Sequence, residues 1–251
     1  MTESLVLGSM LIDGGFARNV LVGASSHFCT AERQFRMPVE HGNQRPPSAQ
    51  WTATAAGSVV ISASGSGSDS GGTSASGSGS TFDGDSANYG NLVSSEAASS
   101  VLSAGGNKVR VEAATIGKVI DAGIKDANQM GAAMAPAAVD TLLNHLEDTE
   151  RTLDYYDLVV TGDIGFIGKD IFSHYDDCGT MLFTKEQDFH SGGSGCGCSA
   201  SVFAGHLLKE MEAGRLKRLL LMSTGAMLST ISPFQGESIP GIAHAVSLEV
   251  E

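Results

Sequence analysis

Strands and helices alternate along residues 108–250, and this alternation constrains the fold more than any other feature of the chain. Short apolar runs predict strands, and longer stretches with apolar residues on one face predict helices. The predicted strands are 108–120, 156–163, 179–184, 218–224 and 242–250, and the predicted helices are 135–149, 165–175 and 198–213. We place Pro136 in the first turn of its helix, where a missing N–H is tolerated. The order of these elements predicts an α/β fold in which helices cover a mixed sheet.

The first part of the chain predicts one helix followed by two strands. A helix is expected at 3–16, because apolar residues recur along it and Gly14 and Gly15 follow its last turn. Strands are expected at 19–25 and 51–64, with a long polar loop between them. Because no strand precedes the helix, we expect part of its apolar surface to be exposed.

Residues 63–107 form the clearest break in composition. This stretch is rich in Gly and Ser and has few apolar residues to bury, so burial cannot offset the entropy cost of ordering it. We interpret it as a flexible insertion that separates residues 1–62 from residues 108–251.

Charge and hydropathy exclude several classes of protein. The net charge of −13 argues against a nucleic-acid partner, which requires clustered Lys and Arg. No apolar run approaches the ~18 residues of a membrane span, and the first residues lack the basic start of a signal peptide. The four cysteines are unevenly spaced and do not form the framework of a secreted disulfide-rich domain.

The run HSGGSGCGCSAS, residues 190–201, is the strongest candidate for a functional loop. Bare glycines let a ligand approach the backbone, and the helix predicted from Cys198 offers unpaired N–H groups and the positive end of its dipole. These features suit a carboxylate. Alternatively, the glycines serve only the close packing of two helices. A metal clip and a strained disulfide between Cys196 and Cys198 are weaker alternatives, because the second ligand pair of a zinc site is missing and a reducing compartment opposes the disulfide.

Six strings of the sequence resemble one known family, in the same order along the chain: TAERQFR, RPPSAQWT, IKDANQMGAAMAPAAVDT, YDLVVTGDIG, GGSGCGCSA and IPGIAHAVSLE. They are similar to the stage V sporulation protein AD family of endospore-forming bacteria, within the thiolase and ketoacyl-synthase superfamily. The resemblance implies a layered α/β/α/β/α fold of two similar halves. Residues 1–62 would be the C-terminal part of the first half, and residues 108–251 the second half. The implied function is binding of dipicolinic acid, pyridine-2,6-dicarboxylic acid, during its uptake into the spore.

The resemblance also implies an incomplete first half and a degenerate catalytic site. The nucleophilic Cys of the superfamily precedes the helix 3–16, so it would lie immediately upstream of Met1, and we expect the chain to be truncated at its N-terminus. The remaining catalytic positions fall on Cys196, Gly162, Asp163, Ser223 and Thr224. These residues supply the proton transfer and the oxyanion stabilisation of a condensing enzyme poorly. We therefore expect a non-catalytic protein, with an acyl-transferring condensing enzyme as the alternative.

The resemblance and the loop together imply a ligand-binding site made of His190, Gly193, Cys196, Cys198, Asp163 and Thr224. Asp163 is either a turn residue satisfied by its neighbours, or a pocket residue that orients His190 or holds a calcium ion chelated by the dicarboxylate. No cofactor and no resident metal are expected. The expected partners are dipicolinic acid, spore membrane transport proteins and a second copy of the chain. The expected location is cytoplasmic or peripheral at the spore inner membrane.

Overall fold

The computed structural model describes residues 1–30, 50–63, 100–102, 107–165, 176–187, 192–229 and 231–251. The strands are β1 (Asn19–Ser26), β2 (Ala55–Ala63), β3 (Ser100–Leu102), β4 (Val109–Ile116), β5 (Leu158–Thr161), β6 (Asp176–Asp177), β7 (Arg218–Ala226) and β8 (Gly241–Val250). The α-helices are α1 (Thr2–Asp13), α3 (Met130–Asp148), α5 (Cys178–Leu182), α6 (Cys196–Val202) and α7 (Leu208–Glu212). A π-helical turn, Phe203–Leu207, joins α6 to α7, so the helical backbone is continuous over 196–212. Short 3₁₀ turns occur at Phe28–Thr30, Leu153–Tyr155, Lys185–Gln187 and Ser232–Gln235.

The strands join in one mixed sheet with the order β1-β2-β3-β4-β8-β7-β5-β6. The neighbours from β1 to β4 pair antiparallel, and so do β4 with β8 and β8 with β7. Strand β5 pairs in parallel with both β6 and β7. The predicted α/β fold with a mixed sheet is therefore confirmed.

Helix α3 covers one face of the sheet over β7 and β8. Its buried Ala137 and Leu142 pack in one cluster with Leu220 and Met222 of β7. Small residues on the inner side of α3 let its backbone approach β8 closely. At Gly241 an added Cβ would lie 2.6 Å from the carbonyl oxygen of Ala133.

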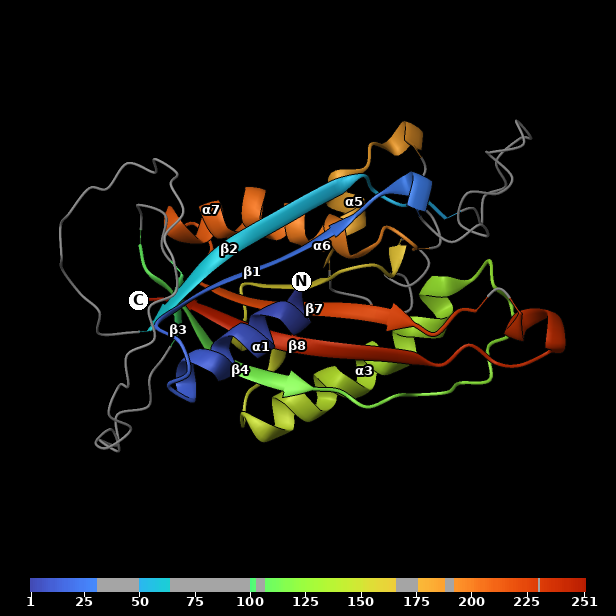
Figure 1. The fold of residues 1–251 in the computed structure, drawn as a ribbon. Coiled ribbons are helices and arrows are strands. Elements are labelled where there is room, and N and C mark those ends of the chain that lie inside the picture. The colour runs from blue at the N-terminus through green and yellow to red at the C-terminus, as the bar shows by residue number, and fades with distance from the viewer. Residues whose placement is uncertain (31–49, 64–99, 103–106, 166–175, 188–191, 230) are drawn as a thin grey trace, which may run out of the picture.

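Helices α1 and α6 lie on the opposite face, and β1 and β2 cover them in turn (Figure 1). Leu219 and Leu221 of β7 point to this side, where they join a second core cluster with Leu5 and Ile12 of α1 and with the fully buried Phe203. Strands β1 and β2 splay away from β7 and β8, while β3 holds them to β4 at one end (Figure 1). Helices α1 and α6 therefore lie in the layer between β1 and β2 on one side and β7 and β8 on the other.

Most predicted elements occur close to where the sequence placed them, but two predictions were wrong. Helix α3 begins at Met130, so Pro136 lies in its interior and not in its first turn. The run 179–184, predicted as a strand, forms α5 instead. The side chain of Asp177 accepts a hydrogen bond from Gly179 N (2.9 Å) and caps this short helix. An apolar run of this length does not distinguish a strand from a helix by periodicity. The predicted helix 165–175 lies almost entirely outside the described residues.

The Gly/Ser-rich segment lies mostly outside the described residues, but its described end is part of the sheet. Ser100–Leu102 forms β3, which pairs with both β2 and β4. The Leu102 side chain is only 1% exposed and belongs to the core between α1 and β4. The expected flexible insertion therefore does not extend over residues 100–102.

We expect Leu102→Ala to destabilise the protein by about 2 kcal/mol, because it leaves a cavity in a packed core. Urea unfolding followed by circular dichroism measures this change. Shortening the segment within 66–97 serves as the control and should leave the unfolding midpoint nearly unchanged, since loop-closure entropy depends weakly on length. An unchanged midpoint in Leu102→Ala would contradict a structural role for β3.

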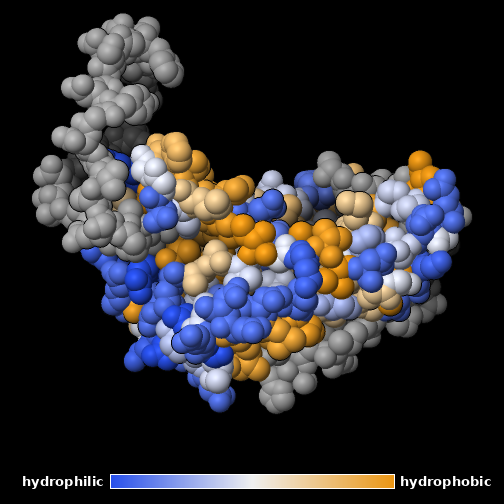
Figure 2. Space-filling model, turned by 90° about the horizontal axis from the view of Figure 1, so that it is seen from below, coloured by the Kyte–Doolittle hydropathy of each residue, from blue (hydrophilic) through white to orange (hydrophobic). Residues whose placement is uncertain are grey.

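Part of the apolar surface of α1 is exposed, as predicted. Leu7, Met10 and Leu11 are 56%, 57% and 44% exposed. Figure 2 shows several patches of apolar surface among polar side chains on the face seen from below. Among the described helices, none combines the length and the apolar character that crossing a membrane requires.

Candidate ligand site at the start of helix α6

The glycine loop, residues 192–198, leads into α6 in a conformation that glycine favours. Gly193 and Gly195 have φ angles of 79° and 83°, in the left-handed region where a side chain is strained. The Gly193 carbonyl accepts a hydrogen bond from Thr52 Oγ1 (2.8 Å), and the Ser194 carbonyl accepts one from Ala53 N (2.8 Å). The segment before β2 therefore fixes the outer side of the loop.

Protein atoms already fill the space beside the loop glycines. A Cβ on Gly193 would lie 2.9 Å from the Cβ of Gln50, and a Cβ on Gly195 would lie 2.9 Å from the side chain of Ser26. At Gly197 it would lie 2.2 Å from the Ala55 carbonyl oxygen. The structure thus uses these glycines for close packing, but against Gln50 and the strands β1 and β2 and not between two helices as the sequence analysis considered.

Asp163 follows β5 and holds the middle of the loop. Its Oδ1 accepts hydrogen bonds from the backbone N–H and from the hydroxyl (2.6 Å) of Ser194, and its carboxylate also interacts with the N–H of Gly195. Burial, with a smaller effect of the nearby Asp177 carboxylate, raises the pKa of Asp163 to about 7 despite these donors. In the structure Asp163 is thus a turn residue satisfied by its neighbours, and it positions the loop.

A second acid, the fully buried Asp177, fixes the turn after β5. Its Oδ2 accepts hydrogen bonds from Thr161 Oγ1 (2.9 Å) and Ile164 N (3.0 Å), in addition to the helix cap at Gly179. Burial raises its pKa as well. The two acids therefore sit in adjacent, strongly bonded turns beneath the start of α6.

The three cysteines near the loop are in different environments. Cys178 and Cys198 are fully buried. Burial raises the pKa of Cys198 to about 12 and that of Cys178 well above its usual value, so both remain protonated thiols at neutral pH. Cys196, the first residue of α6, is exposed, and its thiol donates a hydrogen bond to the Ser25 carbonyl (3.0 Å). All four cysteines of the chain are free.

The first turn of α1 reaches the same region as the start of α6. Thr2 N donates to Ser223 Oγ (3.2 Å), and the two hydroxyls are 2.5 Å apart. Burial lowers the pKa of the Met1 amino group, which interacts electrostatically with the thiols of Cys196 and Cys178. The N-terminal ends of two helices therefore converge near Cys196.

The structure brings together three of the six expected site residues. Gly193, Asp163 and Cys198 surround Ser194. Thr224 lies on the other face of the sheet, because neighbouring strand residues point in opposite directions and Ser223 faces α1. His190 lies outside the described residues. Within the described ranges, no group of three or more His, Cys, Asp or Glu could hold a metal ion.

Several residues that position the loop were missed by the sequence analysis. Ser26 links two segments, since its hydroxyl donates to the Ala53 carbonyl (2.9 Å) and accepts from Gly197 N (3.0 Å). Gln50 packs on Gly193 and donates to the Ala127 carbonyl (2.7 Å). Only Ser194, between the glycines, carried a local sequence signal, because it lies inside the candidate run itself.

The sequence matches the family model described as stage V sporulation protein AD over residues 1–83 and 82–249. The chain belongs to this family. It is also 39% identical over 259 aligned positions to the stage V sporulation protein AD of Bacillus subtilis (strain 168). That match includes 98% of this chain and 64% of the length of the relative. The matched ranges include the glycine loop and both turns that hold it.

Proposed function

We propose that this chain is a non-catalytic dipicolinic acid-binding protein that acts in dipicolinate uptake into the spore during sporulation. Membership of the stage V sporulation protein AD family supports a role in sporulation. The observation that carries the ligand assignment is the meeting of two helix N-termini, those of α1 and of the helix 196–212, beside the exposed Cys196.

Two helix starts suit a ligand with two carboxylates. A helix N-terminus carries about half a positive charge, which favours a carboxylate nearby, and this charge remains although Thr2 N and Gly197 N already donate to Ser223 and Ser26. Dipicolinate is a planar dianion near neutral pH, so each carboxylate can accept from one helix start. Because the glycine faces are filled by Gln50, Ser26 and Ala55, the ligand binds beside the Cys196 side chain and not against the glycines.

The state of the thiols supports binding without covalent chemistry. A condensing enzyme needs a thiolate and a group that accepts its proton. Cys178 and Cys198 are buried with raised pKa values, and both nearby acids bond to backbone and hydroxyl donors. The alternative, an acyl-transferring condensing enzyme, rests on Cys196, whose thiol is exposed at a helix start.

The arrangement of layers supports a thiolase-like architecture. Helix α3, the sheet around β8, the helices α1 and α6, and the strands β1 and β2 follow one another as α/β/α/β. In this proposal β1 and β2 belong to the first of two halves. Strand β1 ends the order of the described strands, and in this proposal its outer edge is the surface through which a second copy pairs. The protein then acts at the surface of the spore inner membrane with membrane transport proteins as partners.

Titration calorimetry with dipicolinate on two Cys196 variants tests the ligand assignment. Cys196→Leu should abolish measurable binding because its bulk fills the space between the helix starts, whereas Cys196→Ala should bind like the parent. Cys29→Leu, at the other exposed cysteine, is the control and should not change binding. Parental binding by both Cys196 variants would place the ligand elsewhere. Loss of binding in Cys196→Ala, or acyl transfer by the parent that this variant lacks, would favour the condensing enzyme.

A further inference from the structure

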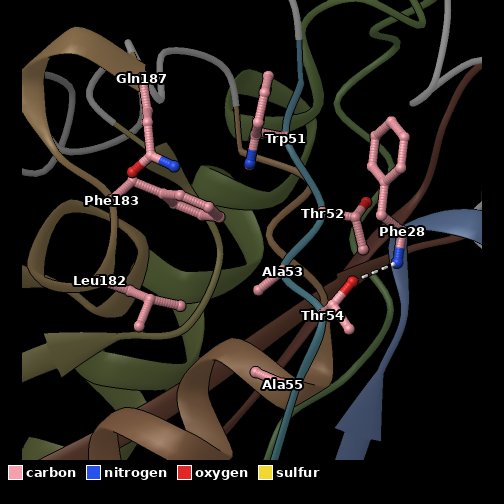
Figure 3. Close-up of a pocket in the computed structure, with 9 residues that line it drawn as sticks. All are labelled: Phe28, Trp51, Thr52, Ala53, Thr54, Ala55, Leu182, Phe183 and Gln187. Carbon is pink, nitrogen blue, oxygen red and sulfur yellow. Dashed lines mark hydrogen bonds between the residues drawn. The ribbon is translucent and has the colours of Figure 1, made fainter. Parts of the chain in front are cut away.

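A pocket of about 460 Å³ opens next to the glycine loop, and no step of the proposed function uses it. Figure 3 shows that its walls come from three segments: Phe28 after β1, residues 51–55 leading into the start of β2, and Leu182 at the end of α5 with Phe183 and Gln187 after it. Its volume lies in the range of small-molecule sites, which are mostly apolar with a few polar groups.

The polar groups of the pocket wall are already bonded within the protein. Thr54 Oγ1 accepts from Phe28 N (3.2 Å), and Thr52 Oγ1 donates to the Gly193 carbonyl. Gln187 Oε1 accepts from Thr184 N (2.8 Å). None of the nine lining residues is charged. An ion placed here would meet no opposite charge to offset the loss of its water, so the wall favours an uncharged group.

Three aromatic rings define the shape of the surface that remains. The Trp51 and Phe28 rings are 6.2 Å apart between centroids and inclined by 33°, and the Trp51 and Phe183 rings are 6.3 Å apart at 81°. These spacings are those of tilted and edge-to-face aromatic pairs. The Trp51 and Phe183 rings already touch edge to face, so a flat ligand ring packs against the surface that the pair presents to the pocket and not between the two rings (Figure 3).

We propose that this pocket binds an uncharged planar aromatic molecule, packed against the aromatic surface that Trp51 and Phe183 present to the pocket. The proposal does not depend on dipicolinate binding at Cys196, because the two places share no lining residue. They are nevertheless connected, since Thr52 and Ala53, which line the pocket, donate hydrogen bonds to the carbonyl groups of Gly193 and Ser194 in the glycine loop. The pocket is therefore a second ligand site on the segment that fixes the glycine loop.

The chain contains a single Trp, so fluorescence reports directly on this pocket. The probe is pyridine-2,6-dicarboxamide, the uncharged counterpart of dipicolinate, with cyclohexanecarboxamide as a non-aromatic comparison. The aromatic amide should change Trp51 emission saturably, and the cyclohexane compound should bind at least about tenfold more weakly. Phe183→Ala should weaken aromatic binding about tenfold, and Phe183→Leu, which keeps apolar volume, should do the same while preserving the fold. Phe16→Ala, at a side chain that is 83% exposed and outside the pocket, is the matched control and should bind like the parent.

Three results would overturn the proposal: no saturable change with the aromatic amide, equal binding of both amides, or affinity unchanged in Phe183→Leu. Saturable quenching by dipicolinate that matches the diamide in affinity would also overturn it, because the wall would then not select uncharged rings. Calorimetry with dipicolinate on Cys196→Leu tests the other site. Loss of dipicolinate binding in Cys196→Leu, with diamide binding unchanged, would confirm two separate sites. If the diamide does not bind to the parent, only the pocket proposal fails, and the dipicolinate assignment is unaffected.

Discussion

Gly197→Ala should destabilise the protein by about 3 kcal/mol, because the added methyl group collides with backbone that cannot move aside. Its Cβ would lie 2.2 Å from the Ala55 carbonyl oxygen and 2.5 Å from Ser26 N. Both contacts belong to the ribbon of β1 and β2, so the helix start and the ribbon must separate. We also expect the hydrogen bond from Gly197 N to Ser26 Oγ to be lost. Urea unfolding followed by circular dichroism measures the change.

Gly205→Ala is the matched control, since it lies in the same continuous helix. Nothing lies within 4 Å of a Cβ built on Gly205, and the position is exposed. Replacing a helical glycine with Ala there should be neutral or stabilising by up to about 1 kcal/mol. Equal unfolding midpoints for the two variants would contradict the close packing of Gly197 against β1 and β2.

Asp163→Asn should stabilise the protein increasingly as the pH rises. In the folded protein burial raises the pKa of Asp163 from 3.8 to about 7. Between these values the folded state binds a proton that the unfolded state does not, so stability is greatest at the acidic end. It falls by about 1.4 kcal/mol per pH unit as the pH rises, and levels off above pH 7. Asn keeps an oxygen that accepts from Ser194 and has no proton to lose, so the variant lacks this fall.

The measured quantity is the difference in unfolding free energy between Asp163→Asn and the parent from pH 5 to pH 8. Burial also raises the pKa of Asp177, so the unfolding free energy of both proteins falls with rising pH for this second reason. Because Asp177 is present in both proteins, its contribution largely cancels in the difference. Asp157→Asn is a control, because that carboxylate bonds to the N–H groups of Lys217 and Arg218 in an exposed setting. A difference that does not vary with pH would show that Asp163 is ionised in the folded protein at all these values.

The fold followed from the sequence wherever periodicity and end signals agreed. β7 and β8 carry long apolar or alternating runs, and the glycines at 14 and 214 mark the ends of α1 and of the long helix. The errors arose where a neighbour far along the chain decides the local structure. Residues 178–182 are helical because Asp177 caps them beside β5, and α3 begins well before Pro136 because its small residues pack on β8.

The candidate site was only partly predictable, because its loop is local in sequence while its supports are not. Gly193, Cys196 and Cys198 could be singled out from one run of residues. Asp163 was found through the resemblance, but its bond to Ser194 depends on how β5 and the loop meet. Thr224 was preferred to Ser223, and only the pleat of β7 shows which of the two faces α1.

The position of β3 also bears on how a protein of this kind can change over evolutionary time. Ala63 and Ser100 pair across adjacent strands, so the two ends of the 36-residue connection between them are held together. Residues can be added or removed at such a point with little effect on stability. Strand β2 begins at Ala55 beside the glycine loop and ends at Ala63, roughly 26 Å farther along. Selection can therefore change the length and the sequence of this connection while the end of β2 that packs on the glycine loop remains under separate constraint.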